Sequence, residues 1–448
     1  MNNQSLIKRS LQSVWHPCTQ MKQHENFPLI PIQKGDGVWL IDSDGNRYLD
    51  AVSSWWVNLF GHNNLRIKDA IKQQLDTLEH VMLAGFTHAP VVELSEKLAK
   101  LTGLGHAFYA SDGASATEIA LKMSFHYWRN CNKPNKTQFI SLQNSYHGET
   151  LGALGVTDVA IFKDTYAPLL MQSVQMPSPD FRLAEDGESA EDFALRCAST
   201  LEQYISANHA QIAAFIIEPL VQCAAGLGMY HPIYLRRARE ICTQYNVHLI
   251  ADEIAVGFGR TGSLFASYNH CDAACTFASC AKGQDCRPDF MCLSKGITGG
   301  YLPLSCVLTK DEIYQAFYDD STARGFLHSH SYTGNPLACS AALATLTIFE
   351  SDNVIAANKA KSAYIQSKMQ VLTYFPIQHL RHQGMISAFD VITKNPHFAR
   401  DCYAAALSYG LLIRPIGKTV YFMPPYTITE SEIDFMIAAT VKVLQKVL

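Results

Sequence analysis

Segments with helical apolar spacing alternate through the middle of the chain with short, continuous apolar runs. Residues 65–78 (LRIKDAIKQQLDTL) and 91–102 (VVELSEKLAKLT) place apolar side chains three and four positions apart, which predicts amphipathic helices. Other runs, such as QIAAFIIE at 211–218, are apolar on both faces. Such runs alternating with helices predict an α/β fold with a mostly parallel central sheet flanked by helices.

Several of these apolar runs end in polar residues. One run leads into the small-residue turn SDGASATE at 111–118, and the others end beside Tyr146, at Glu218, at Asp252 and at Lys295. In open α/β sheets, ligands bind outside the carboxyl ends of the strands. We therefore expect these side chains, which lie far apart in the sequence, to share one edge of the sheet.

The two ends of the chain follow a different pattern. Residues 37–55 (GVWLIDSDGNRYLDAVSSW) predict a β-hairpin with Asp44 and Gly45 at its turn. After a long helix at 334–350, shorter strand-like pieces follow, with a closing helix from about residue 428. We expect a large domain over 61–330 and a smaller α+β domain built from both termini, residues 1–60 and 331–448.

Composition narrows the class of partner. The chain has 448 residues, of which 48% are hydrophobic and 17% are charged, and its formal net charge is −4. Without a basic stripe we expect no nucleic-acid partner, and without a long apolar window no membrane span. The first residues lack the apolar stretch of a secretory signal, so a cytoplasmic location is expected. The 13 cysteines form an odd set, and a disulfide framework is not expected.

Three of the strand-end features suggest one chemistry. A lysine such as Lys295 at a strand end is a candidate amine nucleophile, although many lysines simply extend their ammonium into solvent. A buried carboxylate such as Asp252 can hold a protonated ring nitrogen, or it can be an ordinary ion-pair partner. The turn at 111–118 can bind phosphate at a helix N-terminus, or it can be a plain cap. Together they are the three anchors that pyridoxal phosphate requires.

Three longer segments of the sequence resemble a known family. Residues 216–266, beginning IIEPLVQCAAGLG, together with DFMCLSKGITGGYLPLS (289–305) and HSHSYTGNPLACSAALAT (328–345), resemble the class III aminotransferases of pyridoxal phosphate fold type I. The resemblance covers the chain from about residue 13 to its end. It implies a pyridoxal 5'-phosphate enzyme and a homodimer whose active sites lie at the subunit interface.

The resemblance also assigns roles to residues. Lys295 would bind the cofactor and carry the substrate proton, Asp252 would pair with the ring nitrogen, and Tyr146 would stack on the ring. The phosphate would be bound by Gly113, Ala114 and Ser115, and by Ser331 from the neighbouring subunit. The residues expected to contact substrate are Cys18, Trp55, Trp56, Tyr146, Arg260, Ser329 and Arg414, with Arg414 binding a carboxylate.

Within the class, three segments suggest the substrates. WHPCTQM (15–21), the paired tryptophans, and IRPIGKTVYFMPPY (413–426) resemble the members that make 7,8-diaminononanoate for biotin synthesis. The resemblance implies S-adenosylmethionine as amino donor and 8-amino-7-oxononanoate as acceptor. Cys18 stands where these enzymes usually carry a tyrosine, and some relatives use lysine as donor. An insertion at about 269–286 carries four cysteines spaced unlike a zinc site, and we expect no metal there.

Two other readings compete. A different class III enzyme, acting on ω-amino acids or diamines, would share Lys295 and Asp252. More distantly, GFGRTG at 257–262 matches the glycine pattern of an NAD-dependent oxidoreductase. That fingerprint must open a helix directly after a strand, and the following residues do not predict one.

Overall fold

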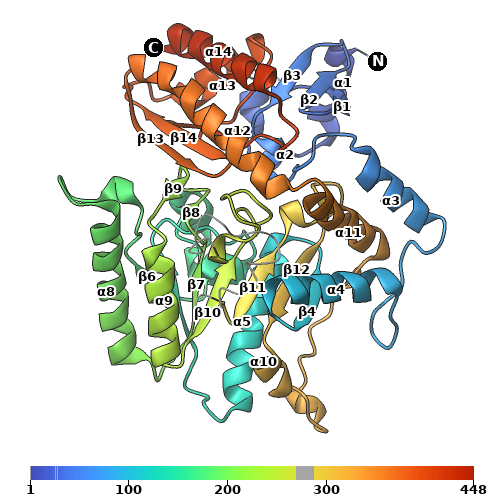
Figure 1. The fold of residues 1–448 in the computed structure, drawn as a ribbon, viewed down its shortest axis with the longest axis vertical. Coiled ribbons are helices and arrows are strands. Elements are labelled where there is room, and N and C mark those ends of the chain that lie inside the picture. Colours follow the sequence, from blue (N-terminus) through green and yellow to red (C-terminus); the bar gives the residue numbers. More distant parts are fainter. Residues whose placement is uncertain (1, 26, 28, 269–286) are drawn as a thin grey trace. The chain divides into compact units, whose positions relative to one another are not determined.

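The computed structural model describes residues 2–25, 27, 29–268 and 287–448 (Figure 1). By compactness the chain divides into two units. One is continuous and covers residues 66–359, and the other combines residues 1–65 with residues 360–448. A smaller domain built from both termini was expected from the sequence.

The larger unit is built on a seven-stranded sheet in the order β4-β12-β11-β10-β7-β5-β6. Only β12, which pairs antiparallel with β11 and β4, breaks the parallel arrangement of these seven strands. The mostly parallel sheet predicted from the apolar runs is therefore confirmed. Its strands are β4 (His106–Ala110), β5 (Gln138–Leu142), β6 (Val174–Met176), β7 (Ile212–Ile217), β10 (His248–Asp252), β11 (Phe290–Leu293) and β12 (Ser305–Thr309).

Helices cover this sheet, with α8 and α9 lying side by side (Figure 1). Every residue of β7, β10 and β11 is buried, which explains why these strands are apolar on both faces. The longer helices of the unit are α3 (Leu65–Leu75), α4 (Ala89–Thr102), α5 (Gly113–Asn130), α8 (Ala190–Asn208), α9 (Ile233–Gln244) and α11 (Pro336–Ser351). Helix α12 (Val354–Met369) begins in this unit, but most of it belongs to the smaller one. Its short helices are α6 (Leu151–Gly155), α7 (Ala160–Lys163) and α10 (Asp311–Gln315), and a two-stranded ribbon pairs β8 (Val221–Gln222) with β9 (Gly228–Met229).

Helix α5 forms the centre of the large core. Its buried side chains, including Ile119 and Trp128, pack against Phe139, Ile216 and Ile250 of the sheet. The indole N–H of Trp128 donates to the carbonyl of Ala213 at 2.9 Å, so the ring is buried without leaving its donor unsatisfied. This packing fixes α5 against the strands whose ends carry the candidate site.

The smaller unit contains two sheets. The first has the order β1-β2-β3-β15 and joins both termini, because β15 of the C-terminal part pairs with β3. The hairpin expected at 37–55 is confirmed by the antiparallel pairing of β2 with β3, and Gly45 has a φ of 90° in its turn. Its strands are β1 (Ile32–Asp36), β2 (Trp39–Asp42), β3 (Arg47–Asp50) and β15 (Leu411–Leu412).

The second sheet of the smaller unit is antiparallel, in the order β13-β14-β16. Helix α14 closes the chain and begins with a capping box, in which Thr429 and Glu432 satisfy each other's backbone N–H groups. The elements are β13 (Ile377–Gln383), β14 (Ile386–Val391), β16 (Thr419–Phe422), α1 (Asn3–Ser13), α2 (Ser53–Trp56), α13 (Phe398–Ser408) and α14 (Glu430–Val447).

The boundary near residue 330 differs from the sequence expectation. Helix α11, assigned to the C-terminal domain from the sequence, belongs to the larger unit. It packs against α4 and against the one-turn helix η7 (Lys295–Thr298). Because η7 begins with Lys295, α11 supports the turn that carries this lysine.

Candidate active site

Five parallel strands of the larger unit bring the polar strand-end residues to one edge of the sheet. The turn before α5, the segment around Tyr146, and the residues Glu218, Asp252 and Lys295 follow β4, β5, β7, β10 and β11 respectively. These strands point the same way, so their carboxyl ends share an edge. The convergence expected from the sequence is present in the fold.

Asp252 and His147 form a buried pair at this edge. Nδ1 of His147 lies 2.7 Å from Oδ2 of Asp252, and the other carboxylate oxygen accepts the N–H of Ile254 at 3.0 Å. The His147 backbone is held on both sides, since its carbonyl accepts the Thr117 hydroxyl and its N–H donates to the Thr157 hydroxyl, each at 2.9 Å. Within the described part of the chain, Nε2 of His147 is buried without a hydrogen-bond partner.

Lys295 stands at the start of η7, one residue after the extended Ser294. Its φ of 45° is left-handed, a conformation that a non-glycine residue keeps only when its surroundings impose it. Desolvation lowers the pKa of the Lys295 amine, while Asp252, Cys223 and Glu218 act in the opposite direction. A lowered pKa favours the neutral amine, which is the nucleophilic form.

Glu218 is a second buried carboxyl group close to Asp252. Its Oε2 accepts the N–H of Tyr146 at 2.9 Å, and its Oε1 accepts the N–H of Cys223 at 3.1 Å. The side chain therefore ties together the segments that follow β5 and β7. Burial raises the pKa of Glu218 to about 7, against the opposing influence of His147. Glu218 thus exchanges its proton near neutral pH.

The turn before α5 presents backbone amides at a helix N-terminus. Among the described residues, the N–H groups of Gly113 and Ala114 have no hydrogen-bond acceptor. Ser115 is already engaged, because its N–H and hydroxyl both donate to the capping carboxylate of Asp112, at 2.9 and 2.8 Å. Gly113 must stay small, since a Cβ there would lie 2.9 Å from Cγ2 of Ile254.

Tyr146 is half-buried and directly precedes His147 of the Asp252 pair. Its hydroxyl donates to Glu149 at 2.9 Å, and its ring packs edge-on against Phe162 with centroids 5.5 Å apart. With the backbone N–H also bonded to Glu218, the residue is fixed from three directions.

Four predicted substrate-contacting residues belong to the smaller unit. Trp56 is buried, while Trp55 is 43% exposed, so the two adjacent rings do not share one environment. The guanidinium of Arg414 lies 4.8 Å from the centroid of the Trp55 ring. Cys18 is exposed and has a φ of 52°.

The remaining predicted residues lie in the larger unit. Arg260 is buried, and Ser329 and Ser331 are exposed. Between them, His330 lies 2.9 Å from the hydroxyl of Ser111, so the Ser329–Ser331 segment lies beside the turn before α5. The GFGRTG motif forms turns and leads only to a one-turn helix, Ala266–Tyr268, so it does not open a helix as a dinucleotide fingerprint does.

No role was predicted from the sequence for His147 or Glu218. Both were visible as polar residues at strand ends, the same signal that singled out Asp252 and Lys295. The cysteine-bearing insertion at 269–286 lies outside the described residues. Within the described part of the chain, no cluster of three or more His, Cys, Asp or Glu side chains is arranged to hold a metal ion, and no helix there is long and apolar enough to cross a membrane.

Comparisons with known proteins agree with this geometry. The aminotransferase class-III family model matches residues 19–444. The adenosylmethionine-8-amino-7-oxononanoate aminotransferase of Helicobacter pylori is 46% identical, over 99% of this chain and 98% of the relative. The protein of the same name from Geobacter sulfurreducens is 37% identical, over 97% and 96% of the two chains.

Solved structures are also similar over their full length. The crystal structure of adenosylmethionine-8-amino-7-oxononanoate aminotransferase from Methanocaldococcus jannaschii superposes with a TM-score of 0.91 at 34% identity, covering 100% of both chains. An omega transaminase from Pseudomonas jessenii in complex with PMP superposes with a TM-score of 0.90 at 28% identity, covering 99% of this chain and 98% of that one.

Proposed function

Because this chain belongs to the class III aminotransferases, we propose that it transfers an amino group from S-adenosylmethionine to 8-amino-7-oxononanoate, giving 7,8-diaminononanoate for biotin synthesis. The proposal is supported by relatives of that name that match nearly the whole chain. The observation that carries it is the placement of Lys295, the Asp252–His147 pair and the free amides of Gly113 and Ala114 along one sheet edge.

Pyridoxal phosphate is the cofactor, as in other class III aminotransferases. The residues present fit each part of this molecule. The amides of Gly113 and Ala114 would bind its phosphate, the carboxylate of Asp252 its ring nitrogen, and the amine of Lys295 its aldehyde. When bound, the cofactor supplies the carbonyl group that takes up the amino group and a ring that stores the electrons of the substrate carbon.

The protein groups supply proton transfer and orientation. In its neutral form, Nζ of Lys295 would take the proton from the reacting carbon of the donor, hold it, and release it again to complete the amino transfer. Asp252 would keep the proton on the ring nitrogen, and His147, bonded to its carboxylate, would hold that carboxylate in place. Tyr146 would lie against the ring, held by the Glu218 carboxylate.

Substrate recognition is assigned to the residues that the family resemblance named. Trp55 and Trp56 would wall the substrate channel, Arg414 would bind the carboxylate of the keto acid, and Cys18 would contact the donor. Ser329 would contact substrate, and Arg260, predicted near the mouth of the site, is buried. These roles stay predictions, as does a cytoplasmic location.

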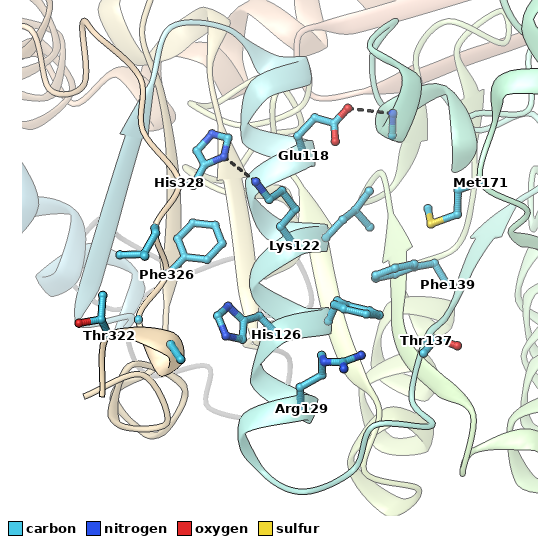
Figure 2. A pocket seen from close by; sticks show the side chains of 16 residues that line it. Glu118, Lys122, His126, Arg129, Thr137, Phe139, Met171, Thr322, Phe326 and His328 are labelled. Carbon is cyan, nitrogen blue, oxygen red and sulfur yellow. Dashed lines mark hydrogen bonds between the residues drawn. The ribbon is translucent and has the colours of Figure 1, made fainter. Parts of the chain in front are cut away.

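We also propose a homodimer in which Ser331 completes the phosphate site of the partner. The surface near Ser331 supports this, because two large apolar side chains of the same segment, Leu327 and Tyr332, are 76% and 60% exposed. Leu327 also lines a pocket of about 570 Å³. Figure 2 shows the α5 side chains of this pocket, Lys122, His126 and Arg129, between Phe326 and His328 on one side and Phe139 and Met171 on the other.

Two measurements test the enzyme assignment. Borohydride treatment of the holoenzyme should fix the cofactor to Lys295, as identified by peptide mass spectrometry. Lys295→Ala should lose the label and nearly all transamination, whereas Lys34→Ala, at an exposed lysine, should keep both. Full transamination by Lys295→Ala would refute the assignment.

A donor panel tests the substrates. With 8-amino-7-oxononanoate as acceptor, we expect S-adenosylmethionine to support turnover and lysine to support little. Preference for lysine would identify the lysine-dependent variant. Turnover of ω-amino acids or diamines without use of the keto acid would identify another class III enzyme.

The dimer is tested by sedimentation and by subunit mixing. We expect the mass of two chains in sedimentation equilibrium. Mixed dimers of Lys295→Ala with Ser331→Glu should recover activity, because one of their two sites then combines an intact lysine with an intact partner serine. A monomer, or mixed dimers without recovery, would contradict the shared site.

A further inference from the structure

The residues of α2, Ser53–Trp56, follow one another in the left-handed region of backbone conformation. Their φ values are 51°, 47°, 70° and 72°. None is glycine, and an L-residue in this region brings its Cβ close to the following carbonyl oxygen. Single residues of this kind are ordinary, but four in succession persist only where surrounding contacts impose them.

Asp50 makes several of these contacts. Its side chain is completely buried. Oδ1 accepts the N–H of Ser54 at 3.0 Å and that of Val52 at 3.4 Å, and Oδ2 accepts the Ser54 hydroxyl at 2.7 Å. Oδ2 also lies 3.0 Å from Nε2 of His62. The Asp50 carboxylate thus binds Val52 and Ser54 at the start of the turn and also contacts His62, which follows the turn in the chain.

The far side of the turn is fixed to β16 and the residue after it. The Ser53 hydroxyl donates to the carbonyl of Met423 at 2.7 Å, and the Trp56 indole N–H donates to the Tyr421 hydroxyl at 3.1 Å. Trp56 is thereby directed into the core. Trp55 is left 43% exposed with the Arg414 guanidinium 4.8 Å from its ring centroid.

We propose that Asp50 is a positioning residue for substrate recognition, because it holds the left-handed turn that pairs the exposed Trp55 ring with the Arg414 guanidinium. The proposal rests on the proposed function, in which these two residues contact the keto acid. An indole face suits the methylene chain of this substrate, and a guanidinium suits its terminal carboxylate. If the turn relaxed to a right-handed path, the Trp55 ring would leave Arg414.

The test measures the two half-reactions of the holoenzyme separately. In Asp50→Asn, we expect the KM for 8-amino-7-oxononanoate to rise about tenfold while kcat changes less than about twofold, since ground-state binding is what the pair provides. The donor half-reaction should change less than the acceptor half-reaction. An unchanged KM in a variant that folds, with an active wild-type enzyme, would overturn the proposal.

A double-mutant cycle separates positioning from general damage. Trp55→Ala alone should also raise the KM, and adding Asp50→Asn to it should raise the KM little further, because Asp50 acts through Trp55. Fully additive effects would show that Asp50 acts through something else and would overturn the proposal. Arg47→Ala is the matched control, as it removes a guanidinium 4.5 Å from the Trp39 ring in the same unit and should leave the KM unchanged.

Two further variants keep the test decisive if Asp50→Asn does not fold. Ser54→Ala removes only the hydroxyl that bonds to Asp50, and we expect its KM to rise about threefold. In Ser54→Gly the same bond is lost, but glycine adopts positive φ freely, so the KM should stay near the wild-type value. Equal KM values for the two variants would overturn the proposal. If the wild-type enzyme itself does not use the keto acid, both the proposed function and this inference fail.

Discussion

Nδ1 of His147 lies 2.7 Å from Oδ2 of Asp252, and both side chains are buried at the carboxyl edge of the large sheet. The carboxylate therefore reaches the candidate ring-nitrogen site with one oxygen already held by an imidazole and the other by the N–H of Ile254. This arrangement orients the carboxylate that would keep the cofactor ring protonated. The position of His147 therefore predicts that it orients Asp252.

Removing the imidazole should weaken this orientation. We expect His147→Phe to lower kcat by about 10-fold to 100-fold, the usual cost of removing one hydrogen-bond partner from a buried charged group. The cofactor should also dissociate faster, which dialysis followed by absorbance spectroscopy would measure. His147→Asn, whose amide can still donate to Asp252, should retain more activity. Equal activity of the two variants would show that the bond to Asp252 is unimportant.

Glu218 should make stability depend on pH in a defined direction. Burial raises its pKa from an ordinary value of 4.5 to about 7, so the folded state prefers the protonated carboxyl group. The stability that this preference provides is complete below pH 4.5 and is lost as the pH rises through about 7. Over that window the loss amounts to about 3 kcal/mol.

The comparison with Glu218→Gln isolates this effect. The amide does not titrate, so the wild-type protein should lose stability relative to the variant between pH 5 and pH 7.5. In the variant, the side-chain NH₂ group would face the backbone N–H of Tyr146 or Cys223, which lowers stability. This loss is the same at each pH, so it does not affect the comparison between pH values. Unfolding midpoints measured at both pH values would test this, and a pH-independent difference would contradict the raised pKa.

Gly113 should tolerate no larger residue at the phosphate turn. In Gly113→Ala the new Cβ would lie 2.9 Å from Cγ2 of Ile254, whose N–H donates to Asp252, so the two ends of the site would be disturbed together. We expect cofactor affinity to fall at least about tenfold, measured by titration of the apoenzyme.

A second substitution at Ile254 can relieve this steric clash. Gly113→Ala combined with Ile254→Ala should recover part of the lost affinity, because the second change removes the carbon atoms that the new Cβ meets. Ile254→Ala alone serves as the control for the cavity it creates. If the double variant binds no better than Gly113→Ala, the contact with Ile254 is not the cause.

The sequence predicted the sheet and the meeting of its strand ends because both depend on local patterns. Runs that are apolar on both faces identify buried parallel strands, and parallel strands must present their ends together. Asp252 and Lys295 could therefore be placed at one edge without a structure. The same reasoning applied to His147 and Glu218, but a histidine or glutamate at a strand end has many ordinary roles.

Pairing between distant residues could not be predicted in this way. His147 and Asp252 are 105 positions apart, and nothing in either segment specifies the other. The left-handed turn at Ser53–Trp56 is also invisible in the sequence, because no glycine marks its positive φ values. Two contacts that fix the turn reach Tyr421 and Met423, which lie 365 and 370 positions further along the chain and meet it only in the folded unit. Helix α11 was likewise assigned by its position in the sequence rather than by its packing on η7.

Arg414 offers a test of recognition that depends on shape rather than charge. Lysine keeps the positive charge but has neither a planar group to lie over the Trp55 ring nor a fork to bind a carboxylate with two parallel hydrogen bonds. We expect Arg414→Lys to raise the KM for the keto acid about 10-fold to 100-fold with a smaller change in kcat. S-adenosylmethionine should be affected less, because its contacts are assigned to the Cys18 side of the site. Steady-state kinetics with each substrate varied in turn would measure both, and an equal rise in the two KM values would place Arg414 outside the carboxylate site.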